Sequence, residues 1–131
     1  MYKNKTAPYF YTFLPYFLYN YKMNLQKHNR LAEYIREIAA EYLVREANHD
    51  SLITVTGVEL SDKETRARIL ISVLPTEKEA DALEFTQRKA NDMRLYFMKK
   101  VKIRRAPRFS FAIDLGEKNR QRIDEISHTS L

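Results

Sequence analysis

The chain contains no cysteine and only two glycines. Without cysteine, disulfide bonds and thiolate metal sites are excluded, and a cytoplasmic location is the expected default. Two isolated glycines, Gly57 and Gly116, cannot build the glycine-rich loop that cradles phosphates in many nucleotide-binding enzymes. The three histidines, His28, His49 and His128, lack the paired spacing of metal ligands, so neither a metal nor a cofactor is expected.

Nothing in the sequence has the arrangement of a catalytic site. No nucleophile has an obvious general base near it in the chain. Asp62, Glu64 and Asp114 lie in an expected loop or at a strand end, where carboxylates usually cap backbone or face solvent. A small α+β hydrolase of the acylphosphatase type would need the phosphate-cradling loop that is missing. We therefore expect no catalytic residue and no enzymatic activity.

Acidic residues are absent from residues 1–22, which hold nine of the 16 aromatic residues and three lysines. Pro8 and Pro15 interrupt this segment and tyrosines outnumber aliphatic residues, which is not the composition of a membrane span. It also lacks the aliphatic core and cleavage site of a signal peptide. Three interpretations stay open: an interfacial anchor, a disordered extension, or a mis-called start with Met23 as the true first residue. Intact-mass analysis of the native protein tests the third.

The remaining composition is that of a globular protein. With 131 residues, of which 44% are hydrophobic and 31% charged, the chain has room for one domain with its own core. We place this domain at residues 23–126 and regard residues 127–131 as a C-terminal tail. The net charge of +6 favours an anionic partner, either nucleic acid or an anionic membrane.

Hydrophobic spacing predicts a helix over about residues 26–47, with Leu31, Ile35, Ile38, Tyr42 and Leu43 on its apolar face. The alternation of apolar and polar residues then predicts two strands, at residues 51–60 and 66–74. The short connection between them indicates an antiparallel hairpin. Gly57 in the middle of the first strand indicates a bulge.

Pro75 ends the second strand, and Thr76 is a candidate N-cap for a helix that runs to about Lys100. The apolar residues of this helix no longer fall on a single face over residues 88–92. Asn and Asp are poor residues for a helix centre. This predicts two helices joined by a bend rather than one straight helix.

A block of basic residues without any carboxylate extends over residues 99–108. Alternation in this block predicts a strand that starts at Val101 and directs Val101 and Ile103 into the core, with Lys102 and Arg104 outward. Pro107 would place this strand at a sheet edge or a bulge. Phe109 and Phe111 share the phase of Ile113, so they are expected in the core rather than on a base-stacking surface. The alternative is a charged strand that is merely solvated.

The predicted order is helix, strand, strand, helix, bend, helix, strand. Helices on one side of a small sheet give a two-layer α+β domain whose other sheet face is open. This order matches the second type of KH domain, a nucleic-acid module that normally clamps backbone with a Gly-x-x-Gly loop. That loop is absent here, so any RNA must be contacted by other residues.

Three blocks of sequence resemble the bacterial ribosome-binding factor A family. The first helix is similar through Arg30-Leu31-Ala32, Ile35 and Ile38. The hairpin is similar through residues 53–62, Ala67-Arg68-Ile69 and Ser72. The closing helix and strand are similar through Met93-Arg94-Leu95, Ile103-Arg104, residues 107–111 and Asp114. The order and spacing of the blocks agree over about residues 23–126.

The resemblance implies a non-catalytic factor with a KH-like fold that binds immature 30S subunits and assists late maturation of 16S rRNA. Family members have an Ala-x-Gly kink between their helices. Here the kink falls at Ala90, Asn91 and Asp92, with Asp92 in place of the glycine. The expected RNA-facing residues are all basic: Arg94, Lys99, Lys100, Lys102, Arg104, Arg105 and Arg108.

The expected partner is therefore 16S rRNA in the small subunit, with no DNA or membrane partner, and a monomer is expected. The alternative is a protein-interaction module that docks through its Tyr- and Phe-rich segment, because exposed aromatic residues are common interface anchors. Deleting residues 1–22 discriminates between the two. A docking module would lose its partner, whereas an RNA-binding core would keep most of its affinity.

Overall fold

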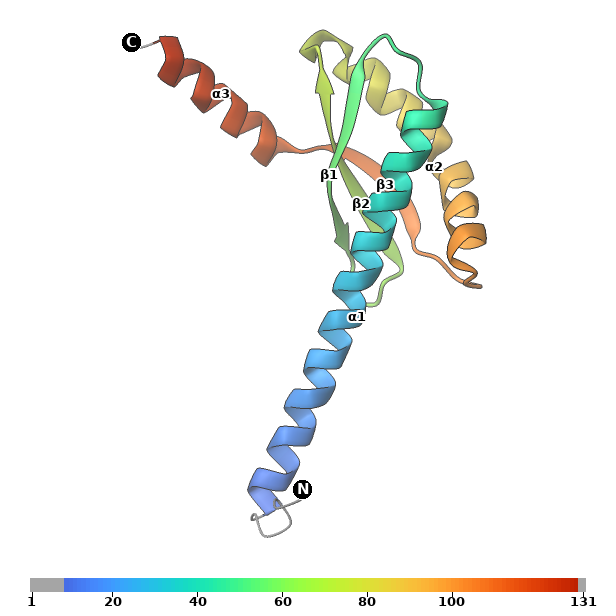
Figure 1. Cartoon of the computed structure of the whole chain (residues 1–131), viewed down its shortest axis with the longest axis vertical. Helices are drawn as coiled ribbons and strands as arrows, with labels where there is room; N and C mark the ends of the chain where they lie inside the picture. The colour runs from blue at the N-terminus through green and yellow to red at the C-terminus, as the bar shows by residue number, and fades with distance from the viewer. Residues whose placement is uncertain (1–8, 130–131) are drawn as a thin grey trace. The chain divides into compact units, whose positions relative to one another are not determined.

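The structure, a computed structural model, describes the backbone of residues 9–129 and the side chains of residues 25–127. Figure 1 shows the elements, which in chain order are α1 (Tyr9–Glu46), β1 (Leu52–Leu60), β2 (Arg66–Leu74), the short 3-10 helix η2 (Thr76–Lys78), α2 (Glu79–Val101), β3 (Arg108–Ile113) and α3 (Leu115–Thr129). The predicted α+β class is confirmed. The chain forms two compact units, Met1–Leu31 and Ala32–Leu131, and all strands belong to the second.

The three strands form one sheet in the order β1-β2-β3. The predicted hairpin is confirmed, because β1 and β2 pair antiparallel. β3 pairs parallel to β2, with α2 in the connection between them, as a parallel pair requires. The predicted bulge is also present: the register shifts between Val55 and Gly57, so Thr56 is the additional residue on β1.

Only one face of the sheet is buried, and it forms the core with α2 and with residues 35–43 of α1, which belong to the second unit. Alternate residues of β2 and β3 point into this core. They are Ala67, Ile69, Ile71, Val73, Phe109 and Phe111. Phe97 of α2 is fully buried and meets Phe109 edge to face, with ring centroids 5.7 Å apart. The core positions predicted for Phe109 and Phe111 are confirmed, and the opposite face of the sheet stays open.

The predicted helix bounds need two corrections. α1 begins at Tyr9, well before the expected start near residue 26, while residues 1–8 lie outside the described part of the chain. Thr76 is not an N-cap, because it is the first residue of η2. Lys78 precedes α2 instead and provides no side-chain capping hydrogen bond.

The two helices expected on either side of a bend form one helix in the structure. α2 is one helix from Glu79 to Val101, and Ala90, Asn91 and Asp92 all lie within it. Its ribbon nevertheless changes direction along its length in Figure 1. Met93 and Phe97 are fully buried on the same side as Ala82 and Thr86. Buried contacts on both sides of residues 90–92 therefore hold the helix continuous through a poor helix-forming sequence.

The strand predicted from Val101 is wrong. Val101 is the last residue of α2, and Lys102 follows it in the left-handed conformation, with φ 59° and ψ 48°. The Lys102 amide donates to the carbonyl of Met98 at 2.8 Å, which closes the helix. A left-handed residue at a helix C-terminus turns the chain away from the helix axis and is not extended, so no strand starts at Val101. β3 begins only at Arg108, immediately after the buried Pro107.

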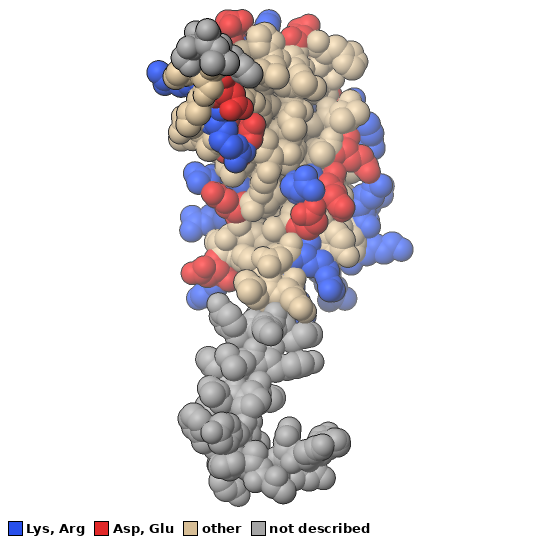
Figure 2. All heavy atoms as spheres, turned by 60° about the vertical axis from the view of Figure 1, so that its left-hand side comes forward, with Lys and Arg blue, Asp and Glu red and all other residues tan. Residues whose placement is uncertain are grey.

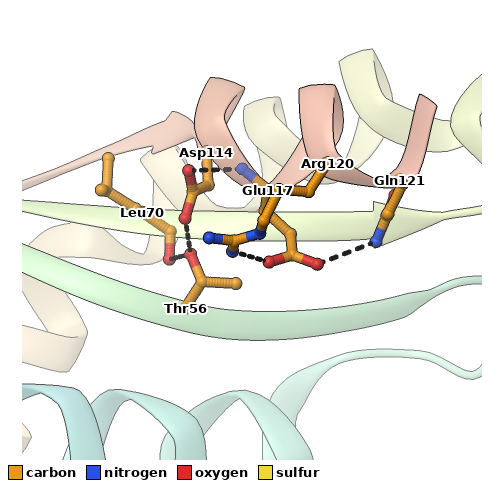
Figure 3. Close-up of polar contacts among 6 residues, drawn as sticks. All are labelled: Thr56, Leu70, Asp114, Glu117, Arg120 and Gln121. Atoms are coloured by element: carbon orange, nitrogen blue, oxygen red, sulfur yellow. Dashed lines mark hydrogen bonds and ion pairs between the residues drawn. The ribbon is translucent and has the colours of Figure 1, made fainter. Parts of the chain in front are cut away.

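Asp114 connects the end of β3 to α3 (Figure 3). Its Oδ1 accepts from the amide of Glu117 at 3.1 Å, as the cap of α3, and its Oδ2 accepts from the Thr56 hydroxyl at 2.6 Å. Thr56 is the bulged residue of β1, and its hydroxyl also donates to the carbonyl of Leu70 on β2 at 3.3 Å, so this hydroxyl joins the bulge to the end of β3. The Thr56 hydrogen bond is the main reason why the pKa of Asp114 lies below its ordinary value.

We predict that Thr56→Val lowers the free energy of unfolding by about 1 kcal/mol at neutral pH, because a hydrogen bond to a carboxylate is lost. A depressed carboxyl pKa adds stability above its unfolded value, and this contribution disappears as pH falls through the folded pKa. The difference between wild type and variant should therefore shrink in acid. Denaturant unfolding over a pH series measures it, with Thr54→Val as a control that removes an exposed hydroxyl. An equal loss at all pH values would contradict the prediction.

Candidate nucleic-acid interface

The chain between α2 and β3 is held in place by one arginine of α2. The Arg94 Nε donates to the carbonyls of Ala106 at 3.2 Å and Pro107 at 3.0 Å, and its Nη2 donates to Ala106 at 2.9 Å. A guanidinium suits this task because it presents several donors in a fixed plane. The sequence predicted that Arg94 faces RNA, whereas the structure shows its half-buried guanidinium bound to this loop.

Five predicted cations surround the clamped loop, and we call them the basic end. They are Lys99 of α2, Lys102, Arg104 and Arg105 of the loop, and Arg108 at the start of β3. All five are exposed. None of them makes an ion pair or a side-chain hydrogen bond within residues 25–127. Their charges are therefore available to an anionic partner.

Lys100, the remaining predicted cation, has partners on α1. Its Nζ lies 3.2 Å from Oε1 of Glu41, and this carboxylate raises the pKa of Lys100. The same nitrogen lies 5.9 Å from the ring centroid of Tyr96, whose hydroxyl donates to Glu41. The Tyr96 bond, followed by Lys100, lowers the pKa of Glu41. Lys100 thus joins α2 to α1, and its charge is offset locally.

The expected set omitted one arginine that the structure places beside the basic end. Arg66, the first residue of β2, is the register partner of Arg108 across the parallel pair, and both are exposed. The alternation of core-facing and outward-facing residues in β2 was sufficient to predict the exposure of Arg66. Because Ala67 and Ile69 face the core, Arg66 and Arg68 had to face outward on the open side of the sheet.

Several cations elsewhere on the molecule are paired with carboxylates. Figure 2 shows Lys and Arg side chains with Asp and Glu side chains among them over much of the visible face. Arg68, for example, is neutralised by Glu59 of β1, with Nη2 and Oε1 2.6 Å apart. In contrast to Arg68, the five cations of the basic end and Arg66 make no ion pair within residues 25–127.

Other classes of site find little support in the described residues. Within residues 25–127, no group of three His, Asp or Glu side chains is placed to hold a metal ion. In the same range, every buried side-chain nitrogen or oxygen has a hydrogen-bond partner. The interior described here thus offers no unsatisfied polar group to a ligand. None of the described helices combines the length and apolar character needed to cross a bilayer.

Comparison with known proteins agrees with this picture of the fold. The family model for ribosome-binding factor A matches residues 27–127. Ribosome-binding factor A of Desulfitobacterium hafniense is 34% identical over 96 residues, covering 70% of this chain and 76% of the relative. Ribosome-binding factor A of Thermodesulfovibrio yellowstonii is 35% identical over 107 residues, which cover 77% of this chain and 91% of the relative.

Solved structures agree as well. The crystal structure of ribosome-binding factor A from Thermus thermophilus aligns with a TM-score of 0.54 at 22% identity, over 65% of this chain and 93% of that one. A homology model of Thermus thermophilus ribosome-binding factor A, fitted into a cryo-EM map of its 30S complex, aligns with a TM-score of 0.53 at 22% identity, over 60% of this chain and 86% of that one. The predicted KH-like fold is thereby confirmed.

We predict that Arg94→Met lowers the free energy of unfolding by about 1–3 kcal/mol, because the carbonyls of Ala106 and Pro107 lose a charged donor. Hydrogen exchange of the amides in residues 103–108 should become faster. Denaturant unfolding and exchange measurements test this, with Lys99→Met as the control for removing an exposed, unpaired cation of the same helix. A variant as stable and as protected as wild type would show that Arg94 does not hold the loop.

Proposed function

Because the chain belongs to the ribosome-binding factor A family, we propose that it binds the small ribosomal subunit and promotes late maturation of 16S rRNA without catalysing a reaction itself. A homology model of the Thermus thermophilus relative named above was fitted into a cryo-EM map of its 30S complex, which supports the same partner for this chain. The basic end is the observation in this protein that carries the proposal.

Electrostatics favours ribosomal RNA as the ligand of the basic end. Each phosphate that a Lys or Arg neutralises releases condensed counterions, so affinity falls steeply as salt rises. Folded RNA is recognised mostly through its shape and backbone. A rigid cationic loop without base-reading side chains is adequate for such recognition, and Arg94 supplies the rigidity by holding the backbone of Ala106 and Pro107.

The predicted RNA-facing set divides into two groups under this proposal. Lys99, Lys102, Arg104, Arg105 and Arg108 contact RNA. Arg94 positions the loop, and Lys100 holds α1 against α2 through Glu41. Arg104 and Arg105 are adjacent, exposed and unpaired within residues 25–127, so they are the residues to test first.

We predict that Arg104→Glu with Arg105→Glu reduces binding to purified small subunits at least about tenfold at low salt, because two phosphate contacts become repulsions. Sedimentation of the protein with small subunits measures the bound fraction. The matched control is Arg88→Glu with Arg122→Glu, which makes the same charge change at exposed positions on α2 and α3.

Circular dichroism should show that both double variants keep the fold. Wild-type binding by a folded Arg104→Glu, Arg105→Glu protein would contradict the proposed interface. Equal losses in the control pair would show that only net charge matters. For the role in maturation, cells lacking this protein should accumulate unprocessed 16S precursor, and the wild type but not the Arg104, Arg105 variant should restore processing.

A further inference from the structure

Two arginines stand side by side on the open face of the sheet. Arg66 and Arg108 are Cα partners in the parallel register of β2 and β3. Neighbouring strands lie about 4.8 Å apart, and residues in register direct their side chains to the same face. Their following residues, Ala67 and Phe109, are both buried, so Arg66 and Arg108 both point away from the core.

No carboxylate compensates this pair within the described residues. Neither arginine makes an ion pair in residues 25–127, although both are exposed. Glu59 lies on the same face but is bound to Arg68, through contacts of 2.9 Å and 2.6 Å from Nε and Nη2. The Glu59–Arg68 pair on the open face is therefore neutral, whereas the neighbouring Arg66–Arg108 pair carries two positive charges.

The backbones that carry the two side chains are fixed to each other. The Ser61 hydroxyl accepts from the amides of Thr65 and Arg66, each at 3.0 Å. The carbonyl of Thr65 in turn accepts from the amide of Arg108 at 2.9 Å. On the other side, Arg94 holds the carbonyl of Pro107. Because these hydrogen bonds already fix the backbone of Arg66 and Arg108, little conformational entropy of the backbone is lost on binding, and this favours affinity.

Like charges directly opposite each other in a sheet destabilise it. An anion placed between the two side chains would remove this repulsion. A phosphate group suits the site because its oxygens accept several hydrogen bonds, and arginine recognises phosphate in a bidentate manner.

We propose that Arg66 and Arg108 together bind a single phosphodiester group of ribosomal RNA on the open face of the sheet. This inference rests on the proposed function and extends the contact surface from the loop onto the sheet. The two arginines repel each other when the protein is free, and they share one phosphate when the protein is bound.

The repulsion between Arg66 and Arg108 is tested on the free protein. Replacing both residues by glutamine relieves the repulsion, so the thermal midpoint of the full chain should rise by about 1–4 °C at low salt. The rise should vanish at high salt, where charges are screened. Arg88→Gln with Arg122→Gln is the control and should leave the midpoint unchanged. An unchanged or lower midpoint for the Arg66, Arg108 variant at low salt would overturn this part.

The shared phosphate is tested by binding to purified small subunits over a salt series. If one phosphate is shared, the double glutamine variant should lose about one unit of the slope of log affinity against log salt, and the control pair none. Arg66→Lys with Arg108→Lys keeps both charges and should restore the slope while affinity stays below wild type. Failure of the lysine pair to restore the slope would overturn the shared site.

The outcomes separate this inference from the proposed function. A wild-type slope in the glutamine pair, together with lost binding in Arg104→Glu, Arg105→Glu, overturns the shared phosphate site and leaves the function standing. Wild-type binding in both variants overturns both. Loss of about two slope units would mean two independent phosphates and would also overturn the shared site.

Discussion

The contact between Arg94 and the carbonyls of Ala106 and Pro107 is the interaction on which the candidate interface depends. It ties the loop before β3 to α2, and it does so with a charged donor in a half-buried position. Without it, the loop would have to be ordered at the moment of binding, which lowers affinity. By fixing this loop, Arg94 holds the neighbouring cations of the basic end in place for RNA binding.

Much of the fold could be predicted from the sequence because its periodicities are strong. The bounds of β2, the hairpin and the irregularity at Gly57 follow from alternation and from a single glycine. The core positions of Phe109 and Phe111 follow from the same rule. The continuity of α2 could not be predicted, since it depends on tertiary contacts of Met93 and Phe97 that outweigh the poor helix propensity of Asn91 and Asp92.

The candidate site was predicted by residue type but not by role. A left-handed Lys102 ends α2, although glycine is the usual residue there, so alternation in residues 101–104 wrongly indicated a strand. Arg94 and Lys100 have the same charge as their neighbours, and only the three-dimensional structure shows that backbone carbonyls bind Arg94 and that Glu41 binds Lys100. The parallel pairing that sets Arg66 beside Arg108 likewise joins residues far apart in the chain, which local patterns do not encode.

The most direct test of the central claim is the affinity of the full chain for purified small ribosomal subunits as a function of salt. If exposed, unpaired cations bind ribosomal phosphates, log affinity should fall linearly with log salt, with a slope that corresponds to at least about three phosphates. Binding that does not change with salt, or no binding at low salt, would contradict the account.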